Sequence, residues 1–151
     1  MAAQAFKLYN RAIRKLGTGT IVLPGQVRIG LVGSAGAFAT RTISLWGSAK
    51  TDEVTEANGY SLSGKALTGE AWTAGVSAGQ IKFDANDPIW TATGGAINSI
   101  KACVLFMSGV AAGSCQALAF ASLTSAGFNL AIGNTLTLQF NANGIFTAAN
   151  G

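Results

Sequence analysis

The feature that most constrains the fold is an alternation of apolar and polar residues around a polar turn, at residues 81–90. Ile81 and Phe83 alternate with polar neighbours, which is typical of a strand with one apolar and one solvated face. The Asp, Asn and Pro residues that follow favour a tight turn before a second strand. Residues 140–146 repeat this design after the alternating residues 135–140, so both segments predict hairpin-like corners of an antiparallel β fold. The side chains expected to shape these turns are Asp84, Asn86, Asp87, Asn141 and Asn143.

The low charge content favours a subunit of an assembly. The 151 residues predict a single domain, residues 1–151, with one core. Only 11% of the residues are charged, against about 25% in ordinary soluble domains. Neighbouring subunits can cover such a surface, so we expect a homo-oligomer or a larger particle. The alternative is a compact, weakly charged monomer.

The charges are unevenly distributed along the chain. Residues 1–49 carry six basic side chains and no acidic one, all six acids lie between Asp52 and Asp87, and no charge follows Lys101. A basic N-terminal part can bind an acidic partner or nucleic acid. We favour the alternative that these basic side chains form the solvated face of a helix, and we expect no direct nucleic-acid contact. No window is long and apolar enough to predict a membrane span, so no membrane partner is expected.

One short amphipathic helix is predicted at about residues 3–16. Its apolar side chains recur at spacings of three and four, and Gly17 is a natural stop. Such a short helix must dock on the sheet or on another subunit to be stable. The predicted docking or interface residues are Phe6, Tyr9, Ile13 and Leu16.

The remaining chain predicts strands joined by many turns. Candidate strands include residues 26–32 and 71–74, a long central strand at 97–107, its neighbour at 114–123, and 135–140. About seven to nine strands at this spacing indicate a sandwich, jelly roll or barrel. The predicted class is therefore mainly β, an antiparallel β-sandwich or jelly-roll-like fold with one short N-terminal helix.

Residues that carry chemistry are sparse. The chain has no His, which excludes a Ser-His-Asp triad and a His metal site. Asp84, Asn86 and Asp87 offer oxygen ligands for Ca²⁺, but the spacing departs from a Ca²⁺ loop and we favour turn capping. No enzymatic activity, metal or cofactor is predicted.

Tryptophan and cysteine each leave two interpretations. The three Trp residues can form a sugar-binding platform, but we favour anchors in the core or at an interface. The two cysteines can face each other across a hairpin, but we favour two small buried residues. These side chains are Trp46, Trp72, Trp90, Cys103 and Cys115.

Several motifs together resemble a family of small structural proteins of tailed bacteriophages. The resemblance runs from residue 6 to residue 146, and the chain departs from it at residues 33–39 and in its charge-free C-terminal third. The motifs are Phe6-Lys7-Leu8-Tyr9-Asn10, Gly19-Thr20-Ile21, Asn58-Gly59-Tyr60, Gly64-Lys65-Ala66-Leu67, Phe83-Asp84-Ala85-Asn86-Asp87-Pro88-Ile89-Trp90 and Phe140-Asn141-Ala142-Asn143-Gly144-Ile145-Phe146.

The resemblance implies a β-sandwich protein of the virion, of the capsid cement or decoration kind. Its implied partner is the major capsid protein, and its implied location is the virion, assembled in the host cytoplasm. The alternatives are a tail, neck or fibre component of the same particle, and a carbohydrate-binding module.

The neutral C-terminal third predicts where an assembly contact lies. Residues 102–151 carry no charged side chain, so their strand edges and faces are weakly protected against association. The small-residue segments 108–113 and 124–134 allow close approach of another backbone. The predicted contact residues there are Ala111, Ala126 and Phe128.

Overall fold

The computed structural model describes residues 5–34, 37–108 and 115–149. Within them the chain forms two short helices and twelve strands. In order these are β1 (Lys7–Leu8), α1 (Asn10–Gly17), β2 (Val27–Val32), α2 (Trp46–Ala49), β3 (Lys65–Ala66), β4 (Ala71–Ala74), β5 (Gln80–Asp84), β6 (Ile89–Thr91), β7 (Ile97–Ile100), β8 (Ala102–Met107), β9 (Ala117–Ser122), β10 (Phe128–Leu130), β11 (Thr135–Thr137) and β12 (Phe146–Ala149).

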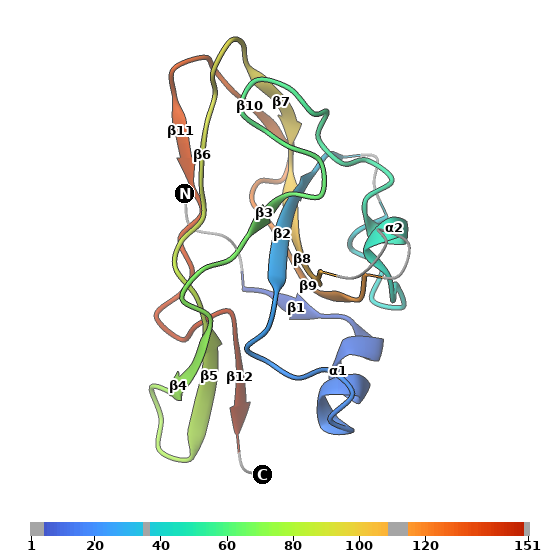
Figure 1. Ribbon diagram of the computed structural model, residues 1–151, viewed down its shortest axis with the longest axis vertical. Coiled ribbons are helices and arrows are strands. Elements are labelled where there is room, and N and C mark those ends of the chain that lie inside the picture. The colour runs from blue at the N-terminus through green and yellow to red at the C-terminus, as the bar shows by residue number, and fades with distance from the viewer. Residues whose placement is uncertain (1–4, 35–36, 109–114, 150–151) are drawn as a thin grey trace.

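The strands form four antiparallel sheets. The largest has the order β1-β9-β8-β2-β3, a second has the order β12-β5-β4, and two pairs join β10 to β7 and β11 to β6. Figure 1 shows β4, β5 and β12 at one end of the molecule, below β6 and β11, with the five-stranded sheet beside them. Buried side chains from all four sheets join in one apolar cluster. The predicted mainly β, antiparallel class with a short N-terminal helix is confirmed, and the fold is β-sandwich-like.

The centre of the large sheet is β8, which lies between β9 and β2. Every β8 residue except the last is buried, and β9 has the same pattern. Both faces of a central strand must be apolar when both are covered. Burial in the core therefore accounts for much of the charge-free sequence after Lys101.

The predicted long strand at residues 97–107 is wrong. It is two strands, because β7 pairs with β10 whereas β8 pairs with β9 and β2. Ser99 has a φ of 60°, and its backbone N–H is bound by the Asn129 side chain where the β7–β10 register is irregular. Lys101 then links the sheets, since its carbonyl accepts the amide of Leu123. No glycine or proline between residues 97 and 107 marks this change of sheet in the sequence.

The two turn motifs lie beside each other. Phe83 of the first motif pairs with Phe146 of the second motif in the β5–β12 ladder. Trp90 of the first motif pairs with Leu136, which precedes the second motif, in the β6–β11 ladder. Each motif was predicted to be a hairpin-like corner, but β5 and β6 belong to different sheets and do not pair. Residues 85–88 instead form a bend that connects β5, in the three-stranded sheet, to β6, which pairs with β11 (Figure 1).

The helix prediction is wrong at its N-terminal end. Helix α1 spans Asn10–Gly17, whereas residues 7 and 8 form β1 and pair with Phe120 and Ala119 of β9. Tyr9 is fully buried, and its hydroxyl donates a hydrogen bond of 2.6 Å to the Phe38 carbonyl. Pairing with β9 and the burial of Tyr9 keep residues 7–9 extended, although the apolar residues of this segment also recur at helical spacing.

A stacked aromatic pair fixes the other side of the large sheet. Trp46, the first residue of the unpredicted helix α2, is fully buried and stacks on Phe106 at 4.3 Å between ring centroids. A Cβ atom added at Gly30 of β2 would overlap the Trp46 ring. This glycine therefore lets the indole lie directly on the strand.

Neither helix of the described residues is long and apolar enough to cross a bilayer.

Candidate functional site

The main candidate site is an open apolar groove between α1 and the three-stranded sheet. One hollow of about 580 Å³ is lined by Leu16, Ile21 and Leu23 on one side and by the sheet on the other. A second hollow of about 500 Å³ continues it past β1. Both are lined by Leu8, Ile13, Phe146 and Thr147, so they are contiguous, and we call them together the α1–β12 groove. Figure 1 shows the two elements that contribute to its lining, α1 and β12, in the lower part of the molecule.

The floor of the groove is one apolar face of the three-stranded sheet. The register places Trp72, Phe83 and Phe146 in one row across the sheet. Because side chains alternate between faces, Ala74, Ile81 and Ala148 form the next row on the same face. The aromatic row packs tightly, with ring centroids 5.3–5.8 Å apart.

The second row is open to solvent. Ile81 is 50% exposed, and Ala74 and Ala148 are also exposed. Across the groove Ile13 is 46% exposed and Val22 is 71% exposed. Apolar side chains that gather in one concave place are typical of a binding surface, whereas single exposed ones need no explanation.

A hydrogen bond joins the two walls at one end of the groove. The Trp72 indole N–H donates to the Leu23 carbonyl at 2.9 Å. The Glu70 carboxylate accepts the backbone N–H groups of Gly25 and Val27 at 2.8 and 2.9 Å. These contacts fix the segment after α1 against the sheet, so the groove does not depend on α1 alone for its shape.

The charges around the groove have one sign. Lys7 and Arg41 line the second hollow, and no acidic side chain among the described residues lines either hollow. Helix α1 adds Arg11, Arg14 and Lys15 and no acid. One end of the groove is therefore basic, and the other is apolar.

The predicted helix residues lie in different surroundings. Tyr9 is buried inside the chain, and Phe6 and Leu16 are partly buried against the core. Ile13 and Leu16 belong to α1, whereas Phe6 and Tyr9 precede it. The structure thus brings Ile13, Leu16 and Phe6 to the groove and places Tyr9 in the core.

The predicted C-terminal contacts lie away from the groove. Ala126 is exposed, and Phe128 is partly buried against the core at the start of β10. Both line a separate shallow hollow of about 260 Å³. Ala111 lies outside the described residues. The segment 124–134, predicted to be a small-residue contact segment, contains β10, which pairs with β7.

The turn residues mostly bond the backbone. Asp84 accepts the Ala85 N–H at 3.0 Å and pairs with Lys82 at 3.1 Å. Asp87 accepts the Phe140 N–H at 2.8 Å, which joins the two motifs. In the second motif Asn141 accepts the Asn143 N–H at 2.9 Å. The Asn86 side chain donates to the Thr68 hydroxyl at 3.1 Å.

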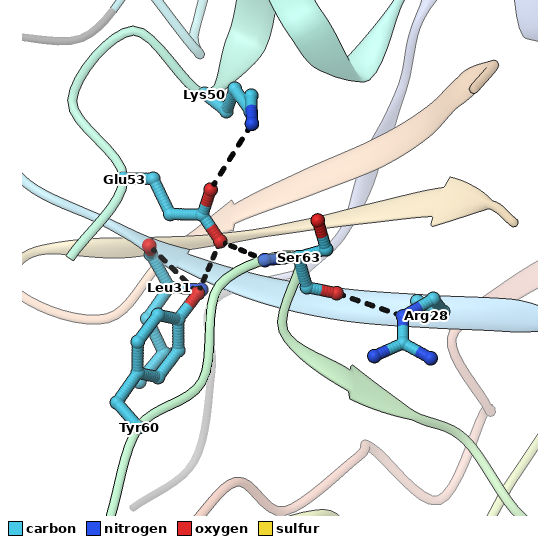
Figure 2. A network of polar contacts seen from close by, with 6 residues as sticks. All are labelled: Arg28, Leu31, Lys50, Glu53, Tyr60 and Ser63. Carbon is cyan, nitrogen blue, oxygen red and sulfur yellow. Dashed lines mark hydrogen bonds and ion pairs between the residues drawn. The ribbon is translucent and has the colours of Figure 1, made fainter. Parts of the chain in front are cut away.

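A second polar cluster surrounds Glu53 (Figure 2). Its carboxylate, whose side chain is only 5% exposed, accepts the Ser63 N–H at 2.6 Å and the Tyr60 hydroxyl at 3.0 Å. The Leu31 N–H donates to the Tyr60 oxygen, and Arg28 donates to the Ser63 carbonyl. The Glu53 side chain is buried because it holds the following loop against β2.

The Glu53 cluster has a structural role. The hydrogen bonds of these side chains go to backbone groups or to other members of the cluster. Burial, together with the nearby Glu53 charge, raises the pKa of Tyr60. A buried polar network whose members are hydrogen-bonded in this way rigidifies the surrounding structure. No group of three or more His, Cys, Asp or Glu in the described part of the chain can hold a metal ion.

Two of the three tryptophans and both cysteines occupy the core, whereas Trp72 lines the groove. Trp46 and Trp90 are 0% and 2% exposed, so neither offers a ring face to a sugar. Cys103 and Cys115 are both buried, and Cys103 faces Ala121 in the β8–β9 register. The favoured interpretations, core anchors and small buried residues, are confirmed for these four side chains.

Sequence reasoning missed the sheet side of the groove. Ile81 and Trp72 were assigned to strands and Phe146 to the second turn motif, but nothing in their local pattern shows that three segments share one apolar face. The available signal was the alternation of Ile81 and Phe83 with polar neighbours.

A comparison of the chain with models of protein families, with curated proteins and with solved structures found no match.

Proposed function

We propose that this chain is a non-enzymatic structural protein of a bacteriophage virion, a cement or decoration protein that binds major capsid subunits. The observation that carries the proposal is the α1–β12 groove, an apolar surface that a single chain leaves uncovered. A cement protein must bury apolar surface against the shell, and it gains strength when many weak contacts act together. The sequence resemblance to small phage structural proteins supports the same assignment.

The composition and the polar residues agree with a binding role. Only 11% of the residues are charged, and the carboxylates of Glu53, Glu70 and Asp87 hold backbone amides. These acids therefore stabilise loops and do not form a pair poised for acid–base chemistry. Trp46 and Trp90 are buried and Trp72 is only partly exposed, so the three indoles do not share one open face, which favours the cement assignment over the carbohydrate-binding alternative.

Locating the protein in purified particles tests this proposal. The experiment is a reconstruction of phage particles that carry the gene, compared with particles from a deletion strain. We expect density for this chain at repeated positions on the outer head surface, lost in the deletion. Density in the tail, neck or fibre, or no copy in the particle, would overturn the cement assignment.

A further inference from the structure

We propose that the α1–β12 groove binds an extended protein segment with one acidic end and one end of alternating apolar residues, which adds to the edge of β12 as a fourth strand. The inference deepens the proposed function, because it names the kind of capsid segment that the protein would take. It rests on the edge of β12, the shape of the hollows and the sign of the charges.

The first observation is the exposed edge of β12. This strand is the last in the order β12-β5-β4, and within the described residues its other edge pairs with no strand. Natural edge strands are usually guarded by charged residues or proline. The edge strands β1 and β3 carry Lys7 and Lys65, whereas Phe146–Ala149, like β4 at the other edge of the same sheet, carries no charge and no proline. The edge of β12 is therefore suited to accept a partner strand.

The second observation is the position of the hollows. Both are lined by Phe146 and Thr147 of β12 and by Leu8 and Ile13 on the opposite side. Strand β5 pairs with one edge of β12, and Figure 1 shows α1 on the opposite side of β12. Because residues of α1 and β12 line both hollows, the groove lies along the unpaired edge. A strand added there projects alternate side chains into the groove, next to Ile81 and Ala148. Main-chain hydrogen bonds then give affinity, and the hollows select the side chains.

The third observation is the change from apolar to basic along the groove. The hollow beside Trp72 and Ile81 has no charged lining residue among those described, whereas Lys7 and Arg41 line the other hollow. An acidic end of the bound segment is attracted to these two cations, and its apolar end fills the other hollow. Such charge pairing fixes the direction in which the segment lies.

A second copy of this chain fits these charges less well. All of its acids lie between Asp52 and Asp87, and several of them already bind backbone amides. Residues 1–4 and 150–151 carry no acid that could face Lys7 and Arg41. The occupant is therefore a segment of a different protein.

The test is a titration of the isotope-labelled protein with synthetic peptides, followed by backbone amide resonances. The probe has four acidic residues joined to an alternating Val-Thr-Ile-Thr-Val segment, made with the acidic half at either end. A control peptide has four lysines in place of the acids. We expect one acidic peptide to shift the amides of β12, Lys7 and Arg41 saturably, and the lysine peptide to bind at least tenfold more weakly at low salt.

Two matched variants test whether the peptide binds in the groove. The Ile81→Lys variant places a charge on the groove floor, and Ile132→Lys places the same charge at a residue that is 63% exposed and outside both linings. We expect Ile81→Lys to weaken peptide binding at least tenfold, and Ile132→Lys to leave it unchanged. Circular dichroism of both variants checks that each retains the fold.

Several outcomes would overturn the proposal. These are no saturable shift up to about 1 mM peptide, equal binding of the lysine peptide, or shifts confined to another surface. Shifts at β12 that depend on protein concentration alone would show that a second copy fills the groove. If the protein bound capsid heads but not the peptide, this inference would be wrong and the proposed function would stand. If it bound the peptide but not the heads, the groove would bind an acidic segment as inferred, and the proposed function would be wrong.

Discussion

At the scale of single residues, Gly30 shows how a side chain from one element limits the sequence of another. Trp46 lies directly over this glycine and cannot move easily, because it is buried and stacks on Phe106. We expect Gly30→Ala to lower the free energy of unfolding by about 1–3 kcal/mol, the usual cost of overpacking a core. Urea denaturation measures this change.

Gly17→Ala is the matched control for that substitution. A Cβ atom at Gly17, the last residue of α1, would have no atom within 4 Å. We expect this variant to be unchanged or up to about 1 kcal/mol more stable, because alanine favours the helix. Equal destabilisation by both variants would contradict the role given to the Trp46 ring.

Three buried acidic groups predict a loss of stability at alkaline pH. Burial raises the pKa of Cys103 from 9.0 to about 12, and burial also raises the pKa values of Tyr9 and Tyr60 above 10.0. Their stabilising contribution is complete below the unfolded pKa values. As pH rises past about 9 the unfolded chain releases the Cys103 proton while the folded protein keeps it, so the free energy of unfolding falls by about 1.4 kcal/mol per pH unit and group.

Denaturation midpoints across this alkaline range test the prediction. Wild type should weaken first as Cys103 titrates in the unfolded chain, and more steeply once the tyrosines do so. In Cys103→Ala the decline should begin only near the tyrosine value of 10.0. A variant that declines from the same pH as wild type would show that this thiol does not control the first step.

At the scale of elements, the five-stranded and three-stranded sheets differ in how well they are covered. Strand β8 is buried along nearly its whole length, whereas β4 and β5 expose Thr73, Ala74 and Ile81. Local opening is easiest where few apolar contacts cover the hydrogen bonds. We expect the amides of β4 and β12 to exchange with solvent faster than those of β8.

Hydrogen exchange of the native protein measures this difference. We expect the slowest exchange in β8 and β9, and added protection of β12 when a partner strand binds. Uniform protection of all strands would contradict this expectation, since the three-stranded sheet would then open only when the whole protein unfolds.

The elements also show what a sequence can and cannot predict. The antiparallel β class, β2, β4 and the central position of β8 follow from local patterns of apolar residues, which record burial. The extended start at residues 6–9 and the break at Lys101 do not, because pairing with distant strands decides them. The groove has the same origin: Ile13, Ile81 and Phe146 converge only through the tertiary fold.

At the scale of the whole molecule, the charge-free C-terminal third has two separate explanations. Strands β8 and β9 lack charge because the core covers them. Strand β12 lacks charge although it lies at a sheet edge and lines the open groove. Core burial does not explain this second case, so we expect the contact predicted in residues 102–151 to lie at β12. The contact predicted at Ala126 and Phe128 stays a prediction.

The most direct test of the central claim, that the groove is the assembly contact, is the binding of three variants to capsid heads that lack this protein. Ile132→Lys should occupy the heads like wild type. Ile81→Lys should bind at least tenfold more weakly, because a charge buried at the contact loses its water. Ala126→Lys tests the alternative contact in the C-terminal loop. If folded Ile81→Lys reached wild-type occupancy, or if only Ala126→Lys lost binding, the groove would not be the contact.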